Sequence, residues 1–142
     1  MNDFPFILAH KYKIGSYEPY VRAILSRACA TVEEGGLGYR GVVINFRGCA
    51  GVPLTSPLFY SAAHTNDTRQ ALRYIAHLYP DALLLGVGFS LGANVLIRYL
   101  GEEREQSRIH AACALGCVRF LINFPVLTSI LIVRSVSSHG IY

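Results

Sequence analysis

A serine at residue 90 stands in a pattern that could carry chemistry, Gly88-Phe89-Ser90-Leu91-Gly92. This G-x-S-x-G spacing is typical of serines that attack a carbonyl carbon from a tight turn between a strand and a helix. Side chains two residues before or after such a serine would collide with the neighbouring strand and helix, so glycine is favoured there. The pattern predicts Ser90 as a nucleophile, with Gly88 and Gly92 forming a nucleophile elbow. The amide of Leu91, at the positive end of the following helix, is the expected oxyanion-hole donor.

The elements on either side of Ser90 fit this prediction. Residues 82–89 form a continuous apolar run, which is typical of a strand buried on both faces of a parallel sheet. Residues 91–100 predict a helix that Gly101 ends. Ser90 therefore falls at a strand–turn–helix junction. A second interpretation stays open, in which Ser90 only caps the helix and the glycines fit a tight turn.

Strands and helices alternate over most of the chain. Further strands are predicted at residues 6–10, 39–46 and 109–115, and further helices at residues 17–30 and 65–79. Strands that alternate with helices in this way indicate crossovers between parallel strands. We expect an α/β fold with about four parallel strands and helices on both faces. The alternation stops after residue 117, which separates a domain at residues 1–117 from an apolar tail at residues 118–142.

Composition limits the classes of protein to consider. Of the 142 residues, 52% are hydrophobic and only 15% are charged, which predicts a chain that forms a core. The net charge is +4, but the arginines are spread singly, so a nucleic-acid partner is not predicted. The four cysteines lack the spacing of a zinc or redox site and are interpreted as buried thiols, and no metal or other cofactor is predicted.

The location is predicted from the start of the chain and its apolar segments. The start has no basic region of a secretory signal. The apolar stretch at residues 120–133 is shorter than the roughly 20 residues that span a bilayer. We therefore expect an intracellular protein, either cytoplasmic or peripheral on a lipid surface.

Four stretches carry a wider likeness: GSYEPYVRAIL (15–25), VVINFRGCAG (42–51), the pattern Tyr60, Thr65 and Asp67, and GVGFSLGANVLIRYLGEE (86–103). Together they resemble α/β-hydrolases of the YheT-like group, which includes yeast medium-chain ethyl ester synthase/esterases and animal lipid hydrolases. The resemblance covers roughly residues 6–117 and implies a partial α/β-hydrolase fold in which Ser90 accepts the acyl group of a carboxylic ester. Because proteins of this group are much longer, we expect this chain to be a truncated fragment.

The first oxyanion loop departs from the group's pattern. Relatives have a His-Gly run followed by a Gly-Gly-Ser segment, whereas here His10 is followed by four larger residues before Gly15 and Ser16. Larger side chains restrict the backbone torsions that glycine allows, so the second oxyanion donor is in doubt.

The base and the acid of a catalytic triad are not identified. In this fold the acid and then the histidine follow the serine, but no Asp follows Ser90. The later acids are Glu102, Glu103 and Glu105, which lie roughly 18 to 22 Å along the helix from Ser90. His110 lies at the start of the predicted strand 109–115, at the end of the sheet opposite Ser90, and His139 lies in the tail. Without a base, Ser90 stays a neutral alcohol and a weak nucleophile.

Two functional hypotheses follow. The first is a serine hydrolase or acyltransferase that acts on fatty acyl esters through Ser90, with water or a short alcohol as acceptor, and that is inactive in this truncated form. The second is a non-catalytic α/β-hydrolase fragment that binds lipid or a protein partner. Peripheral membrane association through the apolar tail is a further hypothesis. The tail is interpreted either as part of a misassembled reading of a longer gene or as the divergent end of a natural short protein.

Overall fold

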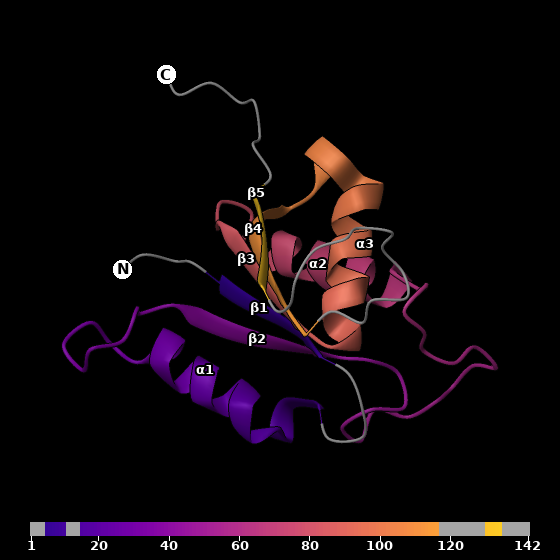
Figure 1. Ribbon diagram of the computed structural model, residues 1–142, viewed down its shortest axis with the longest axis horizontal. Coiled ribbons are helices and arrows are strands. Elements are labelled where there is room, and N and C mark those ends of the chain that lie inside the picture. Colours follow the sequence, from indigo (N-terminus) through magenta and orange to yellow (C-terminus); the bar gives the residue numbers. More distant parts are fainter. Residues whose placement is uncertain (1–4, 11–14, 117–129, 135–142) are drawn as a thin grey trace.

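The computed structural model describes residues 5–10, 15–116 and 130–134 and shows a sheet with helices on both faces (Figure 1). In chain order the elements are β1 (Pro5–His10), η1 (Gly15–Tyr17), α1 (Pro19–Cys29), β2 (Arg40–Asn45), α2 (Asn66–Leu78), β3 (Leu84–Phe89), α3 (Leu91–Glu103), η2 (Arg104–Gln106), β4 (Ile109–Leu115) and β5 (Ile130–Arg134).

The sheet has the strand order β2-β1-β3-β4-β5. The first four of these strands run parallel to one another, which confirms the predicted α/β class with about four parallel strands. β5 pairs antiparallel with β4, so a part of the apolar tail extends the same sheet. The rest of the predicted tail, residues 118–129 and 135–142, lies outside the described residues.

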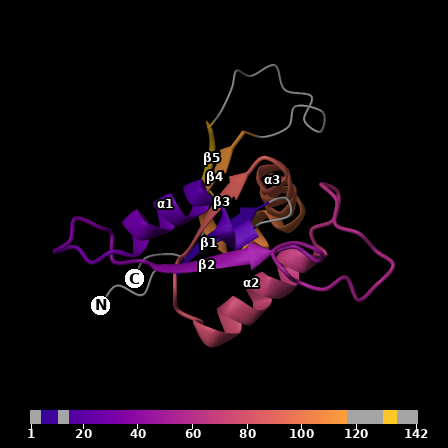
Figure 2. The ribbon, with the colours of Figure 1, turned by 90° about the horizontal axis from the view of Figure 1, so that it is seen from below.

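Helices cover both faces of the sheet, as predicted (Figures 1 and 2). On one face, Val21 of α1 packs in a cluster with Val43 of β2 and Val87 of β3. On the other face, α2 and α3 contribute to a larger cluster that includes Leu72 and Leu96. The neighbouring valines of β2 point to opposite faces of the sheet. Val42 packs with the α2 and α3 cluster, whereas Val43 packs with α1.

The helix α3 lies directly over β3. A Cβ atom added at Gly86 would stand 3.1 Å from Cδ1 of Leu96, which is tighter than an ordinary van der Waals contact. Glycine at this position therefore allows α3 to sit close to the strand that precedes it. This close packing fixes the turn between β3 and α3, where residue 90 lies.

The thiols follow the prediction only in part. Cys49 is buried, with 1% of its surface exposed, and Cys113 is half-buried. Cys29 is exposed, so the prediction of a buried thiol is wrong there. Cys29 is the last residue of α1, and its Sγ lies beside β2, because a Cβ atom at Gly41 would stand 2.7 Å from it. β2 is the edge strand of the sheet, so this side of α1 is open to solvent. Cys117 lies outside the described residues.

None of the helices in the described ranges combines the length and the apolar character needed to cross a membrane. Within the same ranges, no three side chains of His, Cys, Asp or Glu gather where they could hold a metal ion.

Candidate active site

Ser90 occupies the single position between the end of β3 and the start of α3. Its backbone has φ 51° and ψ −116°, a conformation that residues with a side chain rarely adopt and that costs about 1–3 kcal/mol. Two hydrogen bonds hold it there. The Ser90 amide donates to the carbonyl oxygen of Leu115 on β4 at 2.8 Å, and the Ser90 carbonyl accepts from the amide of Asn94 at 3.3 Å. The neighbouring strand and helix thus fix the strained turn from both sides.

The side chain of Ser90 is half-buried and does not cap the helix. An N-cap serine has extended backbone angles and accepts a hydrogen bond from the first turn of the helix. Ser90 has neither the angles nor, among the described residues, a side-chain capping bond to α3. The geometry therefore disfavours the interpretation of Ser90 as a helix cap and leaves its hydroxyl for another role.

The glycine before this turn is required by a close approach of two backbones. A Cβ atom at Gly88 would stand 2.7 Å from Cα of Ala93, 2.7 Å from the carbonyl oxygen of Gly92 and 2.8 Å from the amide nitrogen of Ala93. No side-chain rotation relieves such contacts, because the atoms are backbone. Gly92 is itself buried in the first turn of α3. The collision expected for a side chain in this turn is thus present at Gly88.

Leu91 is the first residue of α3 and is half-buried. Its amide has no acceptor within its own helix, since the first amides of any α-helix lack a partner four residues earlier. The helix dipole places partial positive charge at this end. The role of Leu91 as an oxyanion donor stays a prediction that this position permits.

Asn45, which the sequence motifs did not single out, fixes the end of the first loop. Residues 11–14 of that loop lie outside the described residues. The Ser16 amide donates to Oδ1 of Asn45 at 3.1 Å, and Nδ2 of Asn45 donates to the Ser16 hydroxyl at 3.4 Å. Gly15 has φ +48°, and a Cβ atom there would meet Oδ1 of Asn45 at 2.3 Å. The Ser16 amide is therefore engaged by Asn45, so an oxyanion donor from this loop must come from another residue.

The histidines differ in their distance from this turn. The backbone of His10 pairs with that of Phe89 at the carboxyl edge of the sheet, one residue before Ser90. His110 lies at the amino edge, where its Nδ1 accepts a hydrogen bond from the amide of Leu84 at 3.2 Å. This bond supports the interpretation of His110 as a strand-entry residue. His139 lies outside the described residues.

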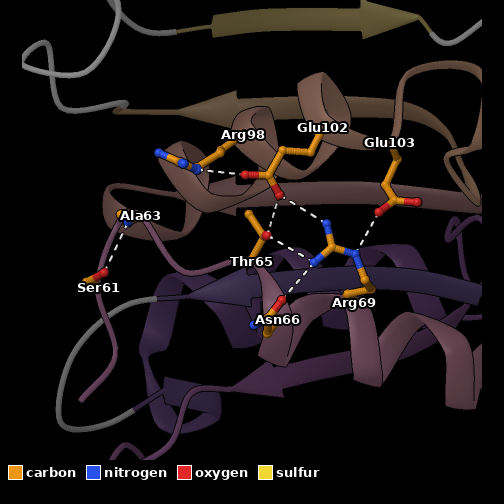
Figure 3. Close-up of polar contacts among 8 residues, drawn as sticks. All are labelled: Ser61, Ala63, Thr65, Asn66, Arg69, Arg98, Glu102 and Glu103. Carbon is orange, nitrogen blue, oxygen red and sulfur yellow. Dashed lines mark hydrogen bonds and ion pairs between the residues drawn. The ribbon is translucent and has the colours of Figure 1, made fainter. Parts of the chain in front are cut away.

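The acids at the end of α3 are occupied in an ion-pair network with α2 (Figure 3). Arg69 donates to Glu103 at 2.6 Å and to Glu102 at 3.0 Å, and Arg98 donates to Glu102 at 2.8 Å. The Thr65 hydroxyl also donates to Glu102. These donors lower the pKa of Glu102 to about 2, with the Thr65 bond as the largest cause. Both carboxylates thus hold α2 against α3 and are not available to orient a histidine at the other end of the helix.

Arg47 pairs with Asp67 across the segment between β2 and α2. Its Nε donates to Asp67 at 2.7 Å, a second nitrogen contacts the other carboxylate oxygen, and its Nη1 donates to the Ser56 hydroxyl at 3.0 Å. This pairing lowers the pKa of Asp67, because the guanidinium hydrogen bonds favour the charged carboxylate. Arg47 ties the β2–α2 loop (residues 46–65) to the start of α2, which is a structural role.

Comparisons with known proteins agree with this fold. The catalytic core domain of acetyl xylan esterase from Trichoderma reesei superposes with a TM-score of 0.52 at 16% identity, over 82% of this chain and 65% of that one. No family model matches the sequence. The chain contains a part of the α/β-hydrolase fold, and its similarity to a lipase and an esterase of yeast shows that it belongs to that superfamily.

Two relatives from Saccharomyces cerevisiae indicate which members of the superfamily it is similar to. One is a protein named monoacylglycerol lipase, 34% identical over 78% of this chain and 23% of its own length. The other is medium-chain fatty acid ethyl ester synthase/esterase 2, 35% identical over 80% of this chain and 24% of its own length. The chain spans about a quarter of the length of these two relatives.

Proposed function

We propose that Ser90 is the nucleophile of a site for carboxylic ester chemistry on fatty acyl esters. In this step the Oγ of Ser90 bonds to the carbonyl carbon, and its proton passes to a base. The bond from that carbon to the alkoxy oxygen breaks, and this oxygen leaves as an alcohol after taking up the proton. Water then releases the acid, or a short alcohol takes the acyl group and forms a new ester.

The observation that carries this proposal is the strained backbone of Ser90 together with a hydroxyl that does not cap the helix. Strained residues persist where the surroundings hold them, and they cluster at active sites. The names of the yeast relatives, a lipase and an ester synthase/esterase, support fatty acyl esters as the substrate class.

We further propose that this chain does not turn over ester by itself. Among the described residues after Ser90, the acids Glu102 and Glu103 are paired with arginines, and His110 lies at the opposite edge of the sheet. The same observations favour the second candidate function, a non-catalytic part of an α/β-hydrolase that binds lipid or a protein partner. The two candidates differ in whether position 90 is activated for attack.

Substitution of Ser90 by cysteine tests that difference, because a thiol ionises without a histidine. A helix N-terminus stabilises a neighbouring negative charge by about 0.5–2 kcal/mol. This corresponds to a thiol pKa lowered by about 0.4–1.5 units from the ordinary 8.5. The matched control is Ser26→Cys, an exposed site in the last turn of α1, where the dipole has the opposite sign.

The measurement is the rate of iodoacetamide alkylation between pH 5 and 10, read at each position by mass spectrometry. The proposal predicts a lower apparent pKa for Ser90→Cys than for Ser26→Cys. Equal pKa values, or a position 90 that is not alkylated in the folded protein, would favour the non-catalytic candidate. A fluorophosphonate probe is expected to leave Ser90 of the folded wild-type chain unlabelled at pH 7. Labelling that Ser90→Ala abolishes would show that a base is present.

A further inference from the structure

Exposed apolar side chains gather at the carboxyl edge of the sheet. The described residues contain eleven large hydrophobic side chains that are exposed, and six of them lie on two segments at this edge. We call these six the apolar rim: Tyr17, Tyr20, Val52, Leu54, Leu58 and Phe59. The two tyrosines lie at η1 and the first turn of α1, and the other four lie in the β2–α2 loop.

Contacts connect both parts of the rim to the turn that carries Ser90. The ring of Tyr20 packs edge-on against Phe89, with 5.0 Å between ring centroids. The β2–α2 loop packs through Cys49 and Tyr60 on Val95, in the second turn of α3. The rim therefore borders the candidate active site.

The side chains at the tip of the loop lie close to one another. A Cβ atom at Gly48 would stand 3.7 Å from Leu54 and 3.8 Å from Phe59, so these two side chains flank the same backbone position. Phe59 also packs on Tyr60, with 4.3 Å between ring centroids. Phe59 remains 56% exposed and Leu58 58% exposed despite these contacts. Apolar groups that gather in this way on a surface mark sites of interaction.

The lack of charged residues in the loop favours its transfer to an apolar phase. Residues 48–63 contain no Asp, Glu, Lys, Arg or His. The nearest cation, Arg47, is neutralised by its pairing with Asp67. Insertion of the four loop side chains of the rim thus requires no charged side chain of the loop to lose its hydration. Glu18 lies between the two tyrosines of the rim, so that part is expected to stay at the level of the headgroups.

We propose that the apolar rim docks on an anionic lipid surface, with the β2–α2 loop inserted at the boundary between headgroups and acyl chains. Protruding loop side chains suit a soft interface, and tyrosine is enriched at membrane surfaces because its ring is apolar and its hydroxyl is polar. The net charge of +4 provides attraction to anionic headgroups. Docking would place the Ser90 turn beside fatty acyl esters in the lipid surface. That these esters are its substrate rests on the proposed function.

Vesicle flotation tests the proposal on the full chain. Vesicles of phosphatidylcholine alone are compared with vesicles that contain phosphatidylglycerol in addition. We expect the wild-type chain to float with the anionic vesicles, and Leu58→Ser with Phe59→Ser to lower the bound fraction at least tenfold. A second variant, Leu54→Ser with Leu58→Ser, leaves the Phe59 and Tyr60 contact intact in case the first disturbs the loop.

The matched control removes two exposed apolar side chains from another face. Tyr74 and Leu78 lie on α2 and are 64% and 49% exposed, and their replacement by serine is expected to leave flotation unchanged. Ser90→Ala is expected to float like wild type, so failure of docking and failure of the proposed chemistry are distinguishable.

Three results would overturn the proposal. The first is a wild-type chain that does not float with either vesicle. The second is flotation that the rim variants retain, which would assign binding to another segment such as residues 118–142. The third is a rim variant that changes the sedimenting mass without vesicles, which would show that a second copy of the chain covers the rim.

Discussion

Replacement of Gly88 by alanine tests the steric demand of the turn before Ser90 through the free energy of unfolding. A second glycine-to-alanine substitution controls for the effect of replacing any glycine. The added Cβ would meet three backbone atoms of α3 at 2.7–2.8 Å, whereas ordinary van der Waals contacts begin near 3.4 Å. The start of α3 must therefore move away from β3 by about 0.7 Å, which is the difference between these two distances. Gly88 has no positive φ, so the whole cost of the substitution is steric.

The size of the effect follows from the stiffness of the neighbours. Overpacking a close-packed interior costs typically about 1–3 kcal/mol, and here the neighbours are backbone atoms that cannot rotate away. We expect Gly88→Ala to lower the free energy of unfolding by about 3 kcal/mol. With an m-value of about 2 kcal/mol/M, the midpoint of urea denaturation should fall by about 1.5 M.

The same substitution at Gly101 is the control. Gly101 lies inside α3, is exposed, and would place its Cβ in open space. Alanine there should raise the free energy of unfolding by about 0.5–1 kcal/mol, because it is the better helix former. Urea denaturation of both variants followed by circular dichroism gives opposite signs if the reasoning is right. A Gly88→Ala variant as stable as wild type, or equal loss in both variants, would refute the packing of α3 on β3 described above.

The remaining predictions concern the ion pairs and the thiols. Arg69→Ala should lower the free energy of unfolding by about 1–2 kcal/mol in urea denaturation, because it removes the ion-pair partner of Glu103 and one of the three donors to Glu102. Arg73→Ala on the exposed face of α2 should change it by less than about 0.5 kcal/mol. The pKa of Glu102 is about 2 in the folded protein against an ordinary 4.5, so its contribution to stability is complete above about pH 5 and is lost as the pH falls toward 2. The stability difference between wild type and Glu102→Gln, measured by denaturation at several pH values, should therefore shrink on acidification; a difference that is constant from pH 7 to 2 would contradict this assignment. In the native chain Cys29 should react with a thiol reagent at once and Cys49 only after unfolding, and prompt reaction of Cys49 would contradict its burial.

Local patterns in the sequence were sufficient to predict the strands and most of the helices. Residues 82–89 were expected as a strand because of their continuous apolar character, and β3 is Leu84–Phe89. The end of α3 was predicted wrongly at Gly101, since the helix continues to Glu103. The reason is not local, because Arg69 of α2 binds the two carboxylates that extend the helix.

The candidate site was predictable only where its parts are adjacent in the chain. The turn around Ser90 combines neighbouring residues, so its spacing could be recognised. The contact between Asn45 and Ser16 joins residues 29 apart, and the pair of Arg47 and Asp67 joins residues 20 apart. Such contacts depend on how strands and loops meet in space, and no spacing in the sequence encodes them.

Acyl transfer to position 90 tests the central claim most directly. Ser90→Cys and Ser26→Cys would be exposed to p-nitrophenyl butyrate at pH 7, and the acyl adduct at each position would be followed by mass spectrometry. If position 90 is the nucleophile of an ester site, the thiol of Ser90→Cys should be acylated at least tenfold faster than that of Ser26→Cys. Equal rates, or an adduct only at position 26, would contradict the assignment of Ser90 as a nucleophile.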